Sequence, residues 1–133
     1  MKYLLDTNTI SYFVKGESSV LARIKGTAPD LLAISSITAM EVEFGLLLNP
    51  ERARKLRPVI AALLKSLETL PFTSADATAT AALRASLQRA GTPVGHYDVM
   101  IAGTAVRHGM TLVTSNTREL KRIAGLQIED WRS

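Results

Sequence analysis

Short apolar runs alternate along the chain with longer stretches in which apolar residues recur at helical spacing. The short runs predict strands over residues 2–6, 30–36, 69–72, 111–115 and 126–131. The longer stretches predict helices over residues 9–14, 19–25, 37–48, 51–68, 74–91, 98–109 and 116–123. Strands and helices that alternate in this way favour an α/β fold, here a three-layer sandwich with helices flanking a mostly parallel central sheet. No repeat or linker interrupts the pattern, so we expect residues 1–133 to form a single domain.

Glycine, serine and proline mark where several of these helices begin, end or bend. Gly16 separates the first two helices, and Ser35 or Ser36 is a candidate N-cap for the third. Ser74 is the predicted cap of the Ala-rich helix. Pro58 is expected to kink its helix or to divide it in two.

The helix over residues 37–48 carries an apolar stripe, which consists of Ile37, Met40, Phe44 and Leu47. The next helix contains a similar segment, "VIAALL". Both segments are consistent with an interface to another chain, but such stripes are buried in a core more often than they form an interface, so burial inside the domain is the first expectation.

The composition narrows the class of protein and of site. A chain of 133 residues with 47% hydrophobic and 21% charged residues suits one globular core. Because cysteine is absent, any bound metal must use oxygen ligands or the two histidines. The net charge of +4 mildly favours polyanionic partners. Asp6 interrupts any signal-peptide pattern, and no apolar run approaches the roughly 20 residues of a membrane span, so we expect a soluble, cytoplasmic protein.

Three acidic residues stand beside apolar segments, where a carboxylate without a partner is costly. Asp6 follows the first strand, Glu41 lies among apolar residues of its helix, and Asp98 begins the most hydrophobic helix. Each has an ordinary alternative: a turn acceptor for Asp6, a solvated side chain for Glu41, and a helix-capping or first-turn acid for Asp98. Parallel sheets, however, bind ligands beyond the carboxyl ends of their strands. Together the three acids predict an oxygen-only site for Mg²⁺ or Mn²⁺.

Four segments then carry a resemblance to a known family, and they stand in the order "LLDTN", "ISSITAMEVEFG", "GTPVGHYDVMIAGTA" and "LVTSNTREL". The sequence resembles the PIN-domain ribonucleases, specifically the VapC toxins of type II toxin–antitoxin pairs, along essentially its whole length. The resemblance implies one domain of PIN-like fold over residues 1–133. By this resemblance, the metal-binding acids of the family correspond to Asp6, Glu41 and Asp98. The family's glutamate stands four residues before a glycine, which here is Gly45, so the resemblance indicates Glu41 and not Glu43.

The fourth acidic position of the family is occupied here by the neutral Asn116. By resemblance, Asn116 is a candidate catalytic residue that positions a water molecule, and the alternative is a plain helix N-cap. Glu119, one helical turn further on, is an accessory candidate that can reach the same site. Thr7 is a second accessory candidate, because its hydroxyl can lie near the metal or donate to a phosphate.

The resemblance implies an Mg²⁺-dependent endoribonuclease that cleaves a structured RNA, either a tRNA or a loop of ribosomal RNA, and thereby inhibits translation. It also implies a homodimer and a heteromeric complex with an inhibitory VapB-type antitoxin. One sequence does not identify the RNA that is cut.

Four residues are the candidates for RNA binding. Three are basic residues that follow Asn116 closely in the sequence, and the fourth is a histidine two residues before Asp98: Arg118, Lys121, Arg122 and His96. A second basic cluster, formed by Arg52, Arg54, Lys55 and Arg57, is expected to be a solvated helix face.

Two functions of other classes stay open. A catalytically silent PIN-fold module that binds RNA or protein would accommodate Asn116 in place of an acid. A phosphohydrolase with Asp6 as its nucleophile usually needs a second aspartate two residues on, where this chain has Asn8. Metal-stimulated RNA cleavage that is abolished by Asp6→Ala separates the nuclease from both.

Overall fold

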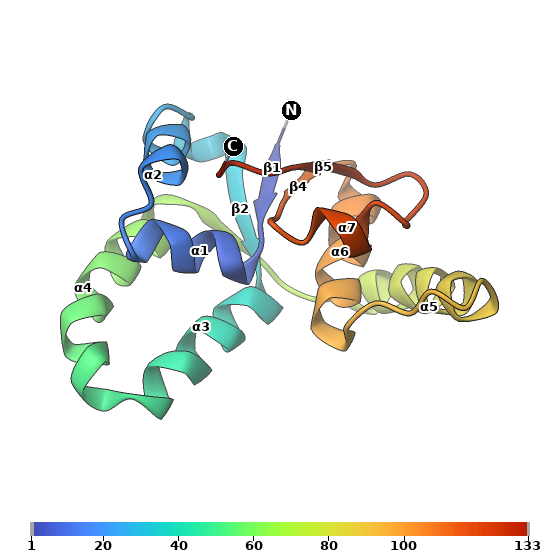
Figure 1. Cartoon of the computed structure of the whole chain (residues 1–133), viewed down its shortest axis with the longest axis horizontal. Coiled ribbons are helices and arrows are strands. Elements are labelled where there is room, and N and C mark those ends of the chain that lie inside the picture. Colours follow the sequence, from blue (N-terminus) through green and yellow to red (C-terminus); the bar gives the residue numbers. More distant parts are fainter. Residues whose placement is uncertain (1, 133) are drawn as a thin grey trace.

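Five short parallel strands form the central sheet of the computed structural model, which describes residues 2–132 (Figure 1). The strands are β1 (Tyr3–Leu5), β2 (Leu32–Ser35), β3 (Glu68–Leu70), β4 (Thr111–Val113) and β5 (Gln127–Glu129). They lie in the order β3-β2-β1-β4-β5, and each neighbouring pair is parallel. The predicted mostly parallel sheet is therefore confirmed.

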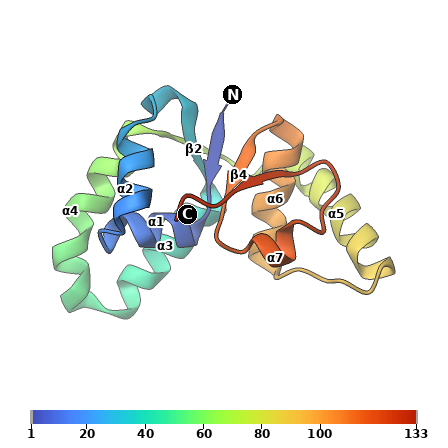
Figure 2. The same ribbon diagram turned by 45° about the horizontal axis from the view of Figure 1, so that its top comes forward.

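Helices cover both faces of this sheet (Figures 1 and 2). The helical segments are α1 (Thr7–Val14), α2 (Ser18–Lys25), η1 (Pro29–Leu31), α3 (Ser36–Leu48), α4 (Pro50–Ser66), α5 (Ser74–Arg89), α6 (His96–His108) and α7 (Thr117–Leu120). The helices α1 to α4 lie on one side of the sheet, and α5 to α7 lie on the other. This arrangement confirms the three-layer α/β sandwich. No helix within residues 2–132 is long and apolar enough to cross a membrane.

Alternation along the buried strands builds the two cores between the layers. In β1, Leu4 packs in the core beneath α5 and α6, whereas Leu5 packs in the core beneath α1 and α2. In β4, Leu112 and Val113 divide in the same way. Successive side chains of a strand point to opposite faces, so strands of three residues still contribute to both layers.

The parallel pairing of β1 with β4 brings distant segments to one edge of the sheet. Residues 3–5 pair with residues 111–113, and the amide of Asp6 donates to the carbonyl of Val113 at 3.0 Å. The segments that follow β1 and β4 therefore leave the sheet side by side, as ligand sites of open α/β sheets require.

Several helix boundaries differ from those expected. The N-cap of α5 is Thr73 rather than Ser74, because Thr73 and Asp76 form a reciprocal capping box. Pro58 does not divide its helix, since α4 runs unbroken from Pro50 to Ser66. The helix that contains Asp98 begins two residues earlier, at His96, which places Asp98 in its first turn.

The apolar stripe of α3 is not buried as expected. Phe44 is 58% exposed and Leu47 is 65% exposed. The inward face of α3 is instead formed by Thr38, Val42 and Leu46, which stand one helical turn apart. Because α3 is apolar on more than one side, its sequence does not determine which side meets the sheet. The expectation of a core stripe was therefore wrong.

Candidate active site

Asp6 is held rigidly where β1 ends and α1 begins. It is the N-cap of α1, and its Oδ1 accepts hydrogen bonds from the amide and the hydroxyl of Thr9, both at 2.8 Å. The Thr9 hydroxyl oxygen also lies 3.0 Å from the carbonyl oxygen of Val113, so the same hydroxyl stands between the cap and β4. Burial raises the pKa of Asp6, while hydrogen bonds from Thr114 and Thr9 oppose the rise and the charge of Asp98 adds to it.

The alternative of a turn acceptor for Asp6 is thus partly realised, because one carboxylate oxygen caps a helix. Its two hydrogen bonds from Thr9 both go to Oδ1. The carboxylate is only 3% exposed, and no Lys or Arg within residues 2–132 forms an ion pair with it. A cap alone does not require such burial, since aspartate side chains are mostly exposed in folded proteins.

Asp98 and Asn116 meet although eighteen residues separate them in the chain. Asn116 donates from Nδ2 to Oδ2 of Asp98 at 3.2 Å and to Oε2 of Glu119 at 2.6 Å. Burial raises the pKa of Asp98, the hydrogen bond from Asn116 opposes the rise, and the charge of Glu119 adds to it. One amide therefore bridges two carboxylates that repel one another.

The position of Asn116 also bears on its alternative role. It occupies the N-cap position of α7, but its side chain makes no capping hydrogen bond. The amide is used on Asp98 and Glu119 instead, so a plain N-cap does not describe it. Glu119 reaches the neighbourhood of Asp98 through this amide, as its spacing of one helical turn suggested.

Glu41 is held from the first helix. The hydroxyl of Thr7 donates to Oε1 of Glu41 at 2.6 Å, and it lies 3.5 Å from the hydroxyl of Thr38. Glu43 points elsewhere: it is exposed and accepts two hydrogen bonds from Arg57, at 2.9 and 2.8 Å. Because Thr7 follows Asp6 directly, this contact fixes Glu41 to the segment that carries the buried aspartate.

The donor chemistry of these residues suits a hard divalent cation. Asp6, Glu41, Asp98 and Glu119 supply only oxygen, which Mg²⁺ and Mn²⁺ prefer, and none is paired with Lys or Arg within residues 2–132. Among these described side chains, however, no group of three acids or histidines is arranged to hold an ion as it stands. The structure brings the predicted acids to one edge of the sheet without closing them around a centre.

The basic candidates lie at the surface beside this edge. Arg118, Lys121 and Arg122 are exposed on and after α7, and the Nη1 of Arg122 donates to the carbonyl of Pro93 at 3.4 Å. His96 is exposed at the start of α6, two residues before Asp98. All four therefore stand near the segments that carry Asp98, Asn116 and Glu119.

Sequence reasoning missed the residues that hold the acids in place. Thr9 fixes Asp6, and Thr114 forms a further hydrogen bond with it. A signal that could have found Thr9 is its position three residues after Asp6, since aspartate is a common helix N-cap. Thr114 carried no such signal, because its contact with Asp6 depends on the pairing of β1 with β4.

Comparison with known proteins agrees with this geometry. Residues 3–126 match the family described as PIN domain. The chain is 40% identical over 131 residues to the tRNA(fMet)-specific endonuclease VapC of Salmonella typhimurium, covering 98% of each sequence. It is 32% identical to ribonuclease VapC2 of Haemophilus influenzae, again over 98% of each sequence.

Similar solved structures indicate the same family. A crystal structure of VapBC2 from Rickettsia felis, bound to a DNA fragment from its promoter, superposes with a TM-score of 0.91 at 31% identity, covering 98% of this chain and 99% of that one. DNA-bound VapBC from Salmonella typhimurium superposes with a TM-score of 0.88 at 41% identity, covering 98% of each chain. The chain belongs to the PIN domain family and, within it, to the VapC ribonucleases.

Proposed function

We propose that this chain is an Mg²⁺-dependent endoribonuclease, with Mn²⁺ as an alternative ion, and that it acts as the toxin of a type II toxin–antitoxin pair. The observation that carries the proposal is the set of carboxylates at the carboxyl edge of the sheet. Burial raises the pKa of both Asp6 and Asp98, and neither has a cationic partner within residues 2–132. Such an arrangement is unfavourable unless a cation neutralises it.

Each residue has a separate task in this proposal. Asp6 and Asp98 hold the ion, and Glu41 either joins them or orients the attacking water. Asn116 keeps Glu119 beside Asp98 through its two hydrogen bonds, so Glu119 supplies the fourth acid and Asn116 positions it. When bound, Mg²⁺ activates water for attack and neutralises charge on the phosphate. Thr7 holds the Glu41 carboxylate toward the same edge.

Initiator tRNA is the first substrate to test, because two relatives at 40% and 37% identity are named for it. Cleavage there would inhibit translation, and a tRNA substrate suits a cytoplasmic enzyme. Arg118, Lys121, Arg122 and His96 are the proposed RNA contacts on the α7 side of the site. Similar solved structures include VapBC assemblies and a toxin–antitoxin complex from Klebsiella pneumoniae, which supports a VapB-type antitoxin as the partner of this chain.

The two competing functions have less support. A phosphohydrolase with Asp6 as nucleophile usually needs a second aspartate two residues on, where this chain has Asn8, and relatives at 40% and 32% identity are named as nucleases. A catalytically silent module was suggested by the absence of an acid at Asn116. Glu119, which contacts Asn116, weakens that reason.

Cleavage of purified initiator tRNA tests the proposal. Mg²⁺ is expected to support cleavage that EDTA abolishes, and Asp98→Asn is expected to lower the rate at least about 100-fold. Glu43→Gln is the matched control, because it removes an equal charge from an exposed acid that pairs with Arg57 instead. Undiminished cleavage by Asp98→Asn would show that the nuclease site is assigned wrongly.

A further inference from the structure

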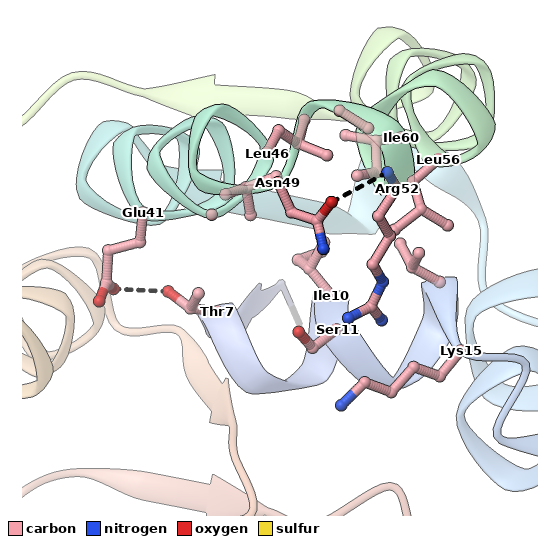
Figure 3. Close-up of a pocket in the computed structure, with 14 residues that line it drawn as sticks. Thr7, Ile10, Ser11, Lys15, Glu41, Leu46, Asn49, Arg52, Leu56 and Ile60 are labelled. Carbon is pink, nitrogen blue, oxygen red and sulfur yellow. Dashed lines mark hydrogen bonds between the residues drawn. The ribbon is translucent and has the colours of Figure 1, made fainter.

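A groove runs from the candidate active site between α1 and the hairpin formed by α3 and α4, and Figure 3 shows the side chains that line it. Its volume is about 210 Å³. The buried side chains of Ile10, Leu46 and Ile60 contribute its apolar lining. Thr7 and Glu41, joined by their 2.6 Å hydrogen bond, stand at one end.

The two ends of the groove carry opposite charge. Glu41 is the only acid among the residues that line it, whereas Lys15 and Arg52 are the only cations. Both cations lie at the end away from Glu41, and the Arg52 side chain extends from α4 toward α1, where Ser11 and Lys15 lie (Figure 3). Two segments that are distant in the sequence thus bring positive charge to one place.

Neither cation is neutralised within the described chain. The side chains of Lys15 and Arg52 form no ion pair with an acid of residues 2–132. Arg57, on the same helix as Arg52, differs because both of its terminal nitrogens are used on Glu43. The charges of Lys15 and Arg52 are therefore available to an anion that enters the groove.

Part of the length of α1 separates this cationic end from Glu41. Thr7 and Lys15 are eight residues apart, so their backbone positions lie about 12 Å apart at the usual helical rise. The charged ends of Lys15 and Arg52 lie beside Ser11, between these two positions and away from Glu41 (Figure 3). An anion that they hold is therefore distinct from the phosphate beside Glu41, and a strand with regularly repeated charges reaches both places.

We propose that Lys15 and Arg52 bind a backbone phosphate of the RNA substrate at least one nucleotide away from the scissile bond, which lets the groove guide the strand toward the carboxylates. This inference rests on the proposed function. The nearby Ser11 hydroxyl and Asn49 amide lie along the same groove and can donate to the same phosphate or its neighbour. Arg52 is thereby separated from the solvated basic face to which the sequence assigned it.

The test measures steady-state cleavage of an initiator tRNA transcript in Mg²⁺ over a series of KCl concentrations. The double variant Lys15→Gln/Arg52→Gln is expected to have a KM about tenfold higher than wild type and a kcat within about twofold of it. It loses contacts that bind a substrate phosphate equally in the ground state and the transition state, and it loses no group that takes part in the reaction. The dependence of log kcat/KM on log salt is expected to become shallower by about 0.7 for each phosphate that the variant no longer binds.

Two control variants separate a specific interaction from general charge. Arg54→Gln/Lys55→Gln removes two charges from α4 outside the groove and is expected to leave KM unchanged. The exchange Lys15→Arg/Arg52→Lys keeps both charges and is expected to restore most of the affinity. Thermal unfolding of each variant checks that the fold is retained.

The outcomes are distinct. If the wild-type chain cuts no RNA in Mg²⁺, the proposed function is wrong, and this inference, which rests on it, is wrong as well. If the wild type is active but the double variant has an unchanged KM and salt slope, or the Arg54/Lys55 control shows the same rise, only the inference fails. Normal cleavage by the double variant together with weaker binding of a VapB-type antitoxin would assign the cations to acidic side chains of that partner and would likewise overturn it.

Discussion

The side-chain amide of Asn116 lies 2.6 Å from the carboxylate of Glu119 and donates a hydrogen bond to it. The same amide reaches Asp98 at 3.2 Å, so a neutral residue separates two acids at the position where the resemblance implied a further acid. Burial raises the pKa of Asp98, the hydrogen bond from this amide opposes the rise, and the charge of Glu119 adds to it.

Replacement of this amide by an acid tests its role. Asn116→Asp exchanges two donated hydrogen bonds for a third negative charge, so we expect the free energy of unfolding in EDTA to fall by about 1 kcal/mol. Saturating Mg²⁺ is expected to restore the loss, because the added carboxylate favours the cation. Urea denaturation with and without Mg²⁺ measures both effects. Gln88→Glu makes the same chemical change on the exposed face of α5 and should show neither. Equal stability of Asn116→Asp and wild type in EDTA would contradict the bridging role.

The raised pKa of Asp98 predicts how stability depends on pH. Burial is the main cause of the rise above 3.8, so the folded protein binds a proton at this carboxyl more tightly than the unfolded chain does. As pH increases from the unfolded pKa of about 3.8 to the higher folded pKa, ionisation of this carboxyl lowers the free energy of unfolding. Above the folded pKa this loss of stability stays constant. Asp98→Asn removes this loss.

Urea denaturation in EDTA at a series of pH values checks this dependence. The stability of Asp98→Asn relative to wild type is expected to increase with pH across that window and then to level off. Groups that do not interact with Asp98 contribute equally to both proteins and cancel, whereas Asp6, whose pKa the charge of Asp98 helps to raise, changes the difference in the same direction. A difference that is flat from acid to neutral pH, or that falls as pH rises, would show that the carboxyl is not destabilised by ionisation in the folded state.

The sequence was sufficient for the sheet and for the approximate place of the acids. The short apolar runs that end at Asp6 and after Val113 have a period and length typical of strands in an α/β protein, and parallel pairing then puts their ends together. The spacing of Asn116 and Glu119 by one helical turn likewise indicated that Glu119 can reach the same site, and the two side chains are in contact there.

Tertiary packing decided what the sequence left open. The α3 segment is apolar on two sides, and only its contacts with α1 and α4 determine that Leu46 is buried and Phe44 exposed. Lys15 and Arg52 line one groove because the α3–α4 hairpin folds back over α1. The local sequence around either residue carries no signal of this tertiary arrangement. Conversely, of the two local effects expected of Pro58, a kink or a division of the helix, the division is absent, because α4 continues through it.

A second buried acid, remote from the candidate site, is expected to stabilise the fold. Asp76 is fully buried and accepts hydrogen bonds from the amide of Thr73 at 2.8 Å and from Nε of Arg107 at 2.6 Å. Burial works to raise its pKa, but these hydrogen bonds outweigh that effect and lower it. Because Arg107 is partly exposed, we expect Asp76→Asn to cost about 2 kcal/mol, less than the roughly 3–5 kcal/mol for breaking a fully buried pair.

The pH dependence of this pair has the opposite sign to that of Asp98. Since the pKa of Asp76 is lowered on folding, its contribution is present above about 3.8 and is lost as pH falls through the folded pKa. Urea denaturation of wild type and Asp76→Asn at neutral and acid pH tests this, and RNA cleavage is expected to be unaffected at temperatures well below unfolding. Glu43→Gln, which breaks an exposed pair, should change stability little. An equal loss from both variants would contradict the role of burial.

The exposed apolar side chains of α3 predict self-association through that helix. Phe44, Leu47 and Leu48 are each more than half exposed, and a cluster of large apolar side chains at a surface usually marks an interface. The homodimer expected for a VapC toxin gives them a partner, since a two-fold interface buries the same patch from both copies. Sedimentation at micromolar concentration is expected to find a dimer for the wild type and a folded monomer for Phe44→Asp/Leu48→Asp. Val59→Asp, at an exposed apolar position of α4, should remain dimeric. A monomeric wild type, or a dimer that survives both α3 substitutions, would show that this face is not where the copies meet.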